Sequence, residues 1–453
     1  MAGLTESLSH FIANPGFEKL PAEAARIVKT GFIDTVATMI AGRDEPVVRI
    51  VREYVAAKKS GAREAHVVFG DAMAASADAA LINGTAAHAL DYDDVAIGGH
   101  PSAVLVPAVL AEGQHLGVSG VDVLRAYLVG YEVWAELLAR EPDAYHLKGW
   151  HPTAVLGTVG AAAAVAHLHG LSADKCRNAV ALAASMASGL VANFGTMTKP
   201  FHAGRAASCA IEAVRLTVGG LTAAPDAIEH HAGYLAALSP QGRADRAGPA
   251  STLGRRLRIL DLGLSIKSYP MCYATHRVID GVLDVVKAND VKPGDVKAVH
   301  ASVGGTQASM LRNHAPVTGL EAKFSLEFAV ASAVVARKVG LRELTDEFVT
   351  QPQVREMMTR VRTSTTDTRC PVDSIFAYAD RTTIELKDGR KLDTGEIRFA
   401  RGNAKLPLDD AELKSKYLDC AAGAGGLDAA ALYGRLNAIG ELDNVGDLVP
   451  HKY

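Results

Sequence analysis

Hydrophobic residues recur at helical spacing through most of the first half of the chain. Val28, Phe32 and Val36 follow one another at intervals of four, and Gly42 is a helix stop signal, so the pattern predicts a helix over 22–41. Several of the segments that repeat this pattern are rich in alanine, which is typical of helices buried in a large all-α core. Further helices are predicted over 47–58, 72–90, 101–115, 120–140, 153–169, 172–187 and 204–218.

The pattern changes after Lys267. Alternating segments rich in Thr, Val and Ile predict strands over 296–303, 360–366 and 381–386, and Asp388-Gly389 predicts a hairpin turn before 391–397. Helical spacing over 276–288 and 321–338 lies between these strands, and it returns over 408–417 and 429–439. We therefore expect a mainly α protein, with a large all-α domain over 1–266 and 405–453. Residues 267–404 are expected to form a smaller α+β lid domain.

Composition narrows the classes of function. With 49% hydrophobic and 21% charged residues, the 453-residue chain resembles ordinary globular proteins. A net charge of −3 gives no strong field that would attract nucleic acid or an anionic membrane. The five cysteines form no CxxC pair, which favours a reduced compartment. The N-terminus lacks a secretory pattern, and the most apolar segment, 154–168, is too short to cross a bilayer. We expect a cytoplasmic protein.

Four polar motifs interrupt these apolar segments. The first places Asp91, Asp93 and Asp94 shortly before His100, and His88 shares a predicted helix face with Asp91. A solvated helix terminus is the alternative interpretation. His and Asp also ligate metals, but no HExxH-like spacing occurs, so the sequence predicts no metal site.

The second motif contains His151, which precedes Pro152 at a predicted helix start. The helix dipole would lower the pKa of an imidazole there, and a neutral imidazole makes a good general base. A plain capping histidine is the alternative. Tyr145 lies just upstream as a weaker candidate.

The third motif contains Lys199, His202 and Arg205, with Arg205 expected to open the helix over 204–218. Cations at a helix N-terminus favour an anion. Because the Walker A spacing is missing, a carboxylate is favoured over a nucleotide phosphate, with Arg205 as a bidentate ligand and Lys199 as a point charge. A solvent-facing loop is the alternative.

The fourth motif contains Lys267, Cys272 and His276, where the predicted domains meet. Lys267 and Cys272 are expected on a lid or hinge that closes over a substrate. Cys272 is also a candidate nucleophile, although a lone cysteine is more often a small hydrophobic residue. His276 heads a predicted helix, and a structural role is the alternative.

Together, the motifs DYDD…HPS, GWHPT, GTMTKPFHAG and KSYPMCYATH resemble those of the MmgE/PrpD family. This family includes 2-methylcitrate dehydratases, cis-aconitate decarboxylases and iminodisuccinate epimerases. The resemblance implies an all-α domain with an α+β lid, a homodimer, and chemistry on di- or tricarboxylates without a cofactor. It places the active-site positions of the family on Asp91, His100, His151, Lys199 and Lys267.

Two departures bear on the reaction that the resemblance implies. Cys272 stands where the decarboxylases have a catalytic histidine, and Val95 stands where they have a threonine. Both argue against a decarboxylase. We therefore expect a hydro-lyase similar to 2-methylcitrate dehydratase. Alternatives are a dicarboxylate epimerase or isomerase, then a cis-aconitate decarboxylase, a metal-dependent hydrolase, and a non-catalytic carboxylate-binding scaffold.

The expected mechanism moves a proton at the carbon alpha to a carboxylate. Lys199, Lys267 and Arg205 would hold carboxylates and stabilise the developing charge. His151 or His100 would act as acid or base, with Asp91 orienting one imidazole. Tyr145 or Cys272 would be the second base that epimerisation requires. His202 and His276 would make further contacts with the substrate.

Overall fold

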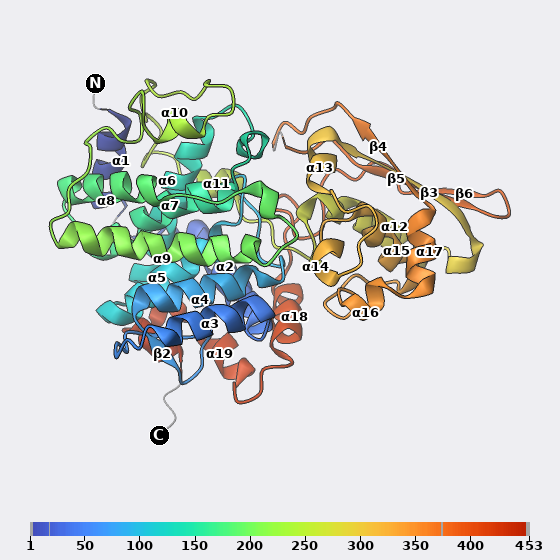
Figure 1. The fold of residues 1–453 in the computed structure, drawn as a ribbon, viewed down its shortest axis with the longest axis horizontal. Coiled ribbons are helices and arrows are strands. Elements are labelled where there is room, and N and C mark those ends of the chain that lie inside the picture. Colours follow the sequence, from blue (N-terminus) through green and yellow to red (C-terminus); the bar gives the residue numbers. More distant parts are fainter. Residues whose placement is uncertain (1–2, 18, 373–374, 450–453) are drawn as a thin grey trace. The chain divides into compact units, whose positions relative to one another are not determined.

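The computed structural model describes residues 3–17, 19–372 and 375–449, so the outermost ends of the predicted all-α domain lie outside the described residues. The chain divides into two compact units (Figure 1). The helical unit comprises Met1–Asn193, Met197–Leu264 and Asp409–Tyr453. The sheet unit comprises Phe194–Thr196 and Ser265–Leu408.

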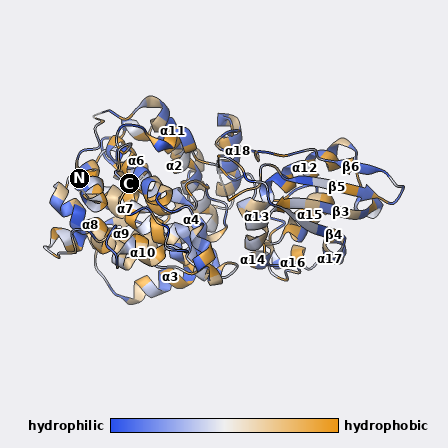
Figure 2. Cartoon of the chain, turned by 90° about the horizontal axis from the view of Figure 1, so that it is seen from above, coloured by the Kyte–Doolittle hydropathy of each residue, from blue (hydrophilic) through white to orange (hydrophobic). Residues whose placement is uncertain are grey.

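The helical unit confirms the expected series of helices. In Figure 1, α9 runs between α7 and α4, and it packs against both. The outer helix α3 buries Val47, Val48 and Val51 and carries both hydrophobic and hydrophilic residues in Figure 2. The main helices are α1 (Leu4–Ala13), α2 (Ala22–Gly42), α3 (Pro46–Ala57), α4 (Ser76–Ala89), α5 (Pro101–Leu116), α6 (Gly120–Ala139), α7 (Pro152–Leu168), α8 (Ala173–Met186), α9 (Thr198–Val218), α10 (Tyr234–Leu238), α11 (Arg258–Leu262), α18 (Asp410–Ala421) and α19 (Ala429–Asn437).

Two helix ends change the predicted placement of motif residues. Helix α9 begins at Thr198 rather than at residue 204, because Pro200 is accommodated in its first turn, where a missing N–H costs little. Arg205 therefore lies inside the helix, and the expectation that it opens the helix is wrong. Helix α4 ends at Ala89, and Asp91 follows with a left-handed φ of 52°. The expectation that His88 and Asp91 share a helix face is therefore also wrong.

Helices α4 and α9 pack closely at Gly84 and Gly204. A Cβ on Gly84 would lie 2.8 Å from the Cα of Gly204, and a Cβ on Gly204 would clash with the carbonyl oxygen of Leu81 and with Oγ1 of Thr85. The absence of side chains at both positions therefore allows the two helices to approach each other closely.

We expect Gly204→Ala to destabilise the protein, because the added methyl group has no room between the helices. Overpacking of this kind typically costs about 1–3 kcal/mol of unfolding free energy. Urea denaturation measures the change. Gly434→Ala on α19, where a Cβ would meet nothing within 4 Å, is the matched control. Equal stability of the two variants would contradict the close packing of α4 on α9.

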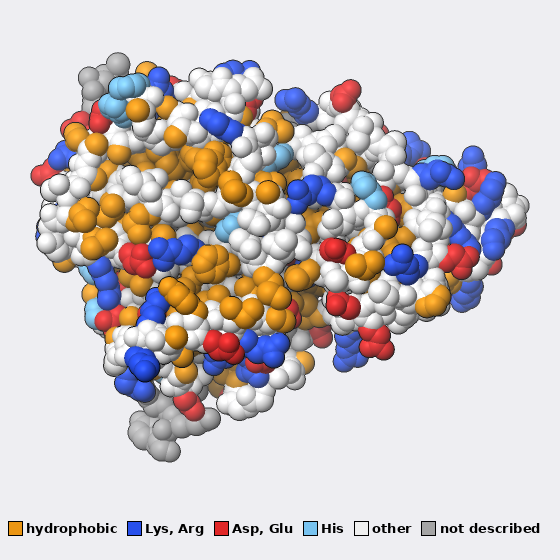
Figure 3. Space-filling model, viewed as in Figure 1, with side chains coloured by type: hydrophobic (Ala, Val, Ile, Leu, Met, Phe, Trp, Pro, Cys, Tyr) orange, Lys and Arg blue, Asp and Glu red, His pale blue; other side chains and the backbone are white. Residues whose placement is uncertain are grey.

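Hydrophobic side chains are also exposed at the C-terminal end of α9. Leu216, Val218 and Leu221 are 47%, 44% and 42% exposed, and Figure 3 shows hydrophobic side chains gathered on the face of the helical unit that carries α9. Exposed apolar patches often mark protein contacts. The homodimer implied by the family resemblance stays a prediction. Among the described residues, no helix combines the length and apolar character needed to cross a membrane.

The sheet unit is built around four strands in the order β4-β3-β5-β6. Strands β3 and β4 are parallel, and β5 and β6 continue the sheet antiparallel. The strand predictions are confirmed, although β6 is shorter than expected. The strands are β3 (Val296–Gly304), β4 (Val361–Thr366), β5 (Arg381–Leu386) and β6 (Lys391–Asp393), and a separate pair, β1 (Ala65–His66) with β2 (Met73–Ala74), lies in the helical unit.

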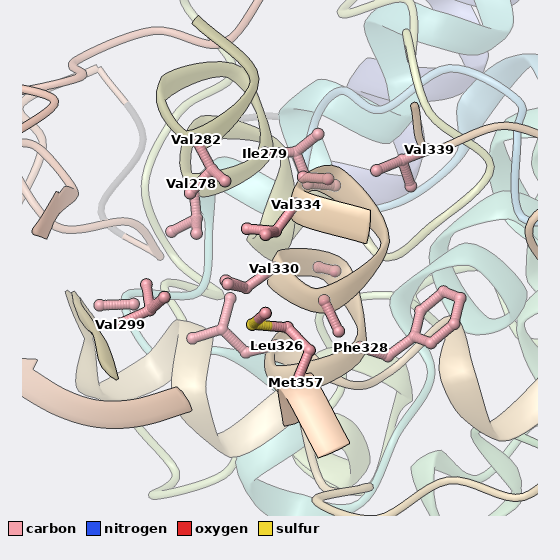
Figure 4. Close-up of a cluster of buried hydrophobic side chains, with 14 of the residues drawn as sticks. Val278, Ile279, Val282, Val299, Leu326, Phe328, Val330, Val334, Val339 and Met357 are labelled. Atoms are coloured by element: carbon pink, nitrogen blue, oxygen red, sulfur yellow. The ribbon is translucent and has the colours of Figure 1, made fainter. Parts of the chain in front are cut away.

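Helices cover this sheet and form its core. The predicted helix over 321–338 is divided in two, because Ser325 caps a new helix by accepting a hydrogen bond from the backbone N–H of Phe328. Figure 4 shows Val282 and Val330, from two of these helices, in one buried cluster with Val299 of β3. The lid role of this unit stays a prediction. Its helices are α12 (His276–Ala288), α13 (Gly305–Met310), α14 (Gly319–Ala322), α15 (Leu326–Val335), α16 (Asp346–Val349) and α17 (Pro352–Thr359).

Candidate active site

Side chains of the first three motifs lie close together in the helical unit. They are carried by the end of α4 and the loop that follows it, and by the first residues of α5, α7 and α9. Most are buried despite their charge or polarity, which is costly unless such groups are paired or functional. The group consists of His88, Asp91, Asp93, His100, His151, Lys199 and His202.

Asp93 joins two imidazoles. Nδ1 of His88 lies 2.9 Å from its Oδ1, and Nδ1 of His100 lies 3.0 Å from its Oδ2. Burial raises the pKa of Asp93, but the two imidazoles outweigh this effect and hold it well below its usual value. Burial lowers the pKa of His88 to about 3. Asp93 is therefore a carboxylate, and it favours a hydrogen on the Nδ1 of His88 that faces it. The His88 ring then presents an unprotonated Nε2.

Lys199 and Asp91 form a buried ion pair. Nζ of Lys199 donates to Oδ1 of Asp91 at 2.6 Å, and the two residues are 4% and 3% exposed. Nε2 of His100 lies 3.8 Å from the same carboxylate oxygen. The pair therefore places a cation, a carboxylate and a potential base within a few ångströms of one another.

A second pair of imidazoles lies on α7 and α9. Nδ1 of His151 lies 3.2 Å from Nδ1 of His202, so one ring donates a hydrogen bond to the other. Burial and the charge of Lys199 hold the pKa of His151 well below its usual value, and the same causes lower the pKa of His202 to about 4. The expected N-cap position and lowered pKa of His151 are confirmed, although burial rather than the helix dipole is the main cause.

Four of these residues could also hold a cation. His88, Asp91, Asp93 and His100 each offer a ligand atom, and these atoms lie within 4.8 Å of one another. Imidazole and carboxylate ligands suit several transition metals. However, the ammonium group of Lys199 already contacts Oδ1 of Asp91 and would repel a divalent ion there. We therefore interpret the cluster as a site for proton transfer.

Two other candidates of the helical unit have different contacts. The Tyr145 hydroxyl donates to the carbonyl oxygen of Leu137 at 3.5 Å, and burial raises its pKa. Arg205 contacts Glu212 through both terminal nitrogens, at 3.2 and 3.4 Å. The described contacts bring neither residue to the Asp93 cluster, so Arg205 as a carboxylate ligand lacks structural support.

The fourth motif belongs to the sheet unit. Lys267 is buried, and half-buried Cys272 packs against the hydrophobic cluster of that unit. His276 begins α12, as predicted, and its Nε2 lies 3.4 Å from the carbonyl oxygen of Met271. The roles that the resemblance implies for Lys267, Cys272 and His276 stay predictions.

The central position of His88 and Asp93 was not predicted from the sequence. His88 was considered only as a neighbour of Asp91, and Asp93 only as one of three aspartates before His100. The signal that could have found them is the HxxDxD spacing from His88 to Asp93, which puts an imidazole and a carboxylate on either side of a helix end.

Comparisons with known proteins agree with the motifs. The MmgE/PrpD N-terminal domain matches residues 6–247, and the MmgE/PrpD C-terminal domain matches residues 269–432. The cis-aconitate decarboxylase of Homo sapiens is 28% identical over 433 residues, which cover 92% of this chain and 87% of that protein. The cis-aconitate decarboxylase of Aspergillus terreus is 23% identical over 443 residues, which cover 92% of this chain and 89% of that protein. A cis-aconitate decarboxylase-like protein of Aspergillus oryzae is 40% identical over 124 residues, which cover 25% of this chain and 26% of that protein. The chain therefore belongs to the MmgE/PrpD family and is an enzyme.

Proposed function

We propose that this enzyme is a lyase that acts on a di- or tricarboxylate without a cofactor, by moving the proton at the carbon alpha to a carboxylate. The observation that carries the proposal is the position of Asp93 between His88 and His100, beside the ion pair of Lys199 with Asp91. This arrangement combines oriented proton acceptors with a buried cation, the two elements that such a reaction requires.

Lys199 is the proposed electrostatic catalyst. When a base removes the alpha proton, the negative charge spreads onto the oxygens of the substrate carboxylate. A cation held in a buried, preorganised position stabilises that charge more than water does. Asp91 holds the ammonium group at 2.6 Å and so fixes its position before the substrate binds.

Within this class we propose a hydro-lyase similar to 2-methylcitrate dehydratase. One imidazole removes the alpha proton, the electron pair forms the carbon–carbon double bond, and a second group protonates the leaving hydroxyl, which departs as water. The site offers two neighbouring pairs of imidazoles as bases for the first step, and the ammonium group of Lys199 as a proton donor for the second. One pair is His88 with His100, and the other is His151 with His202.

Decarboxylation of cis-aconitate is a second candidate, favoured by the names of the relatives. In that reaction the bond to the departing CO2 breaks, and an acid protonates the carbon that keeps the electron pair. Val95 and Cys272, where the decarboxylases have threonine and histidine according to the resemblance, argue against it. Epimerisation of a dicarboxylate stays a further alternative.

Proton NMR in deuterated water tests these reactions on a panel that includes 2-methylcitrate, cis-aconitate and small dicarboxylates. We expect a hydroxy acid to yield an alkene signal with loss of water. Release of CO2 with deuterium uptake would replace the hydro-lyase with the decarboxylase, and exchange without net change would indicate an epimerase. Ligand-induced stabilisation without any turnover or exchange across the panel would contradict a catalytic role.

A further inference from the structure

The last part of the chain returns to the helical unit and buries a lysine there. Helix α18 packs against α2 (Figure 1), and Lys416 on α18 is only 7% exposed. Lysine is rarely buried to this degree unless its charge is paired or used. The contacts of its ammonium group therefore indicate what it does.

The ammonium group of Lys416 has three partners. Nζ lies 2.6 Å from Oδ1 of Asp34 on α2 and donates to the carbonyl oxygen of Tyr92 at 2.8 Å. It also lies 4.0 Å from the centroid of the Tyr92 ring, within the range of a cation–π contact. Lys416 therefore holds Tyr92 by its backbone and its ring, and Asp34 supplies the opposite charge.

Tyr92 is the residue between Asp91 and Asp93. Its carbonyl group belongs to the peptide bond that leads into Asp93, so a hydrogen bond to this oxygen restrains the orientation of Asp93. Asp91, on the other side, has a φ of 52°, a strained conformation for a residue other than glycine. Such conformations persist only where the surrounding contacts enforce them.

We propose that Lys416 is a positioning residue of the active site. By fixing Tyr92, it keeps the Asp93 carboxylate between His88 and His100, and through Asp93 it keeps a hydrogen on the Nδ1 of His88. Lys416 does not touch the reacting atoms in this proposal. Its effect on catalysis rests on the proposed function, whereas its effect on the His88 imidazole can be observed without any substrate.

The test replaces both residues of the ion pair, Asp34 and Lys416, with uncharged ones. Lys416→Met alone leaves Asp34 buried without this partner and is expected to unfold easily. The double variant Asp34→Asn/Lys416→Met removes both charges, a change that folded proteins often tolerate. In the double variant we expect kcat to fall by about 10–100-fold, as when second-layer partners of an active site are removed. KM should stay within about threefold, because no group that binds the substrate changes.

Two single variants are matched controls. Asp34→Asn also breaks the buried ion pair and should lower stability, but it keeps Lys416 beside Tyr92, so the folded protein is expected to retain most of the wild-type kcat. Tyr417→Phe alters the next buried residue of α18, whose hydroxyl has no hydrogen-bond partner among the described residues. It should leave kcat unchanged. A double variant with wild-type kcat, or an Asp34→Asn variant that loses as much kcat as the double variant, would overturn the positioning role.

Nitrogen-15 NMR of labelled histidines gives a readout that does not need turnover. The wild-type protein should show His88 as a single tautomer protonated at Nδ1, and the double variant should show mixed tautomers of His88. If the tautomers are unchanged in the double variant, the proposal fails even where the reaction is known. If they change while the wild-type enzyme acts on no carboxylate, the proposed function fails and the positioning role stands.

Discussion

Replacing His151 with alanine is expected to lower kcat by about 10²–10⁴-fold while the protein stays folded, the usual contribution of a general acid or base. His151 is a buried N-cap residue whose pKa lies well below its usual value, so it is a neutral imidazole with an unprotonated ring nitrogen. Its Nδ1 lies 3.2 Å from Nδ1 of His202. Steady-state kinetics on the substrate found in the NMR panel measures the effect, and circular dichroism checks the fold.

His167→Gln is the matched control for this variant. His167 lies at the other end of α7, where its Nδ1 bonds to the carbonyl oxygen of Ile12. This change should leave kcat unaltered. Near-wild-type turnover of His151→Ala would remove His151 from the mechanism and would leave His100 as the remaining candidate of the predicted pair.

Asp91→Asn is expected to impair both stability and catalysis. The change removes the carboxylate that Lys199 contacts at 2.6 Å inside the protein. Breaking a buried ion pair from one side typically costs about 3–5 kcal/mol of unfolding free energy. The loss of kcat should be at least as large as that of His151→Ala, because the cation that stabilises the developing charge is displaced.

A double variant separates these two effects. Asp91→Asn/Lys199→Met removes both charges and should recover most of the lost stability, as observed for other buried pairs. It should recover no activity. Urea denaturation and kcat are measured on the same preparations. A double variant that regains wild-type kcat would show that the pair serves only the fold.

The periodic parts of the fold could be predicted because they depend on local spacing. Helix α2 and strand β5 appear in the sequence as repeats of hydrophobic positions, and both were found where expected. Prediction from local spacing failed where one backbone angle decides which way a side chain points. Nothing in the hydrophobic pattern indicates that Asp91 adopts a left-handed conformation, which takes it off the face of α4.

The candidate site could be predicted only in part, because the sequence indicates residue types but not which of them come into contact. The residue types and the motifs indicated Asp91, His100, His151 and Lys199. The contacts depend on how helices pack, and packing joins residues that are far apart in sequence. Lys416 and the carbonyl of Tyr92 are separated by 324 positions. Arg205 is a further example, since its residue type suggested an anion ligand and the fold places it beside Glu212, a contact that the motif does not indicate.

We expect the Asp93 cluster to move a proton at the carbon alpha to a carboxylate. Incubating the wild-type enzyme and Asp93→Asn with the panel of acids in deuterated water, and following deuterium at that carbon by NMR, tests this expectation most directly. We expect the wild-type enzyme to transfer hydrogen at this carbon in at least one acid. Asp93→Asn should do so at least about 10²-fold more slowly, because His88 is then no longer held as a base. Equal rates for the two proteins, or no transfer by the wild-type enzyme on any acid, would contradict this expectation.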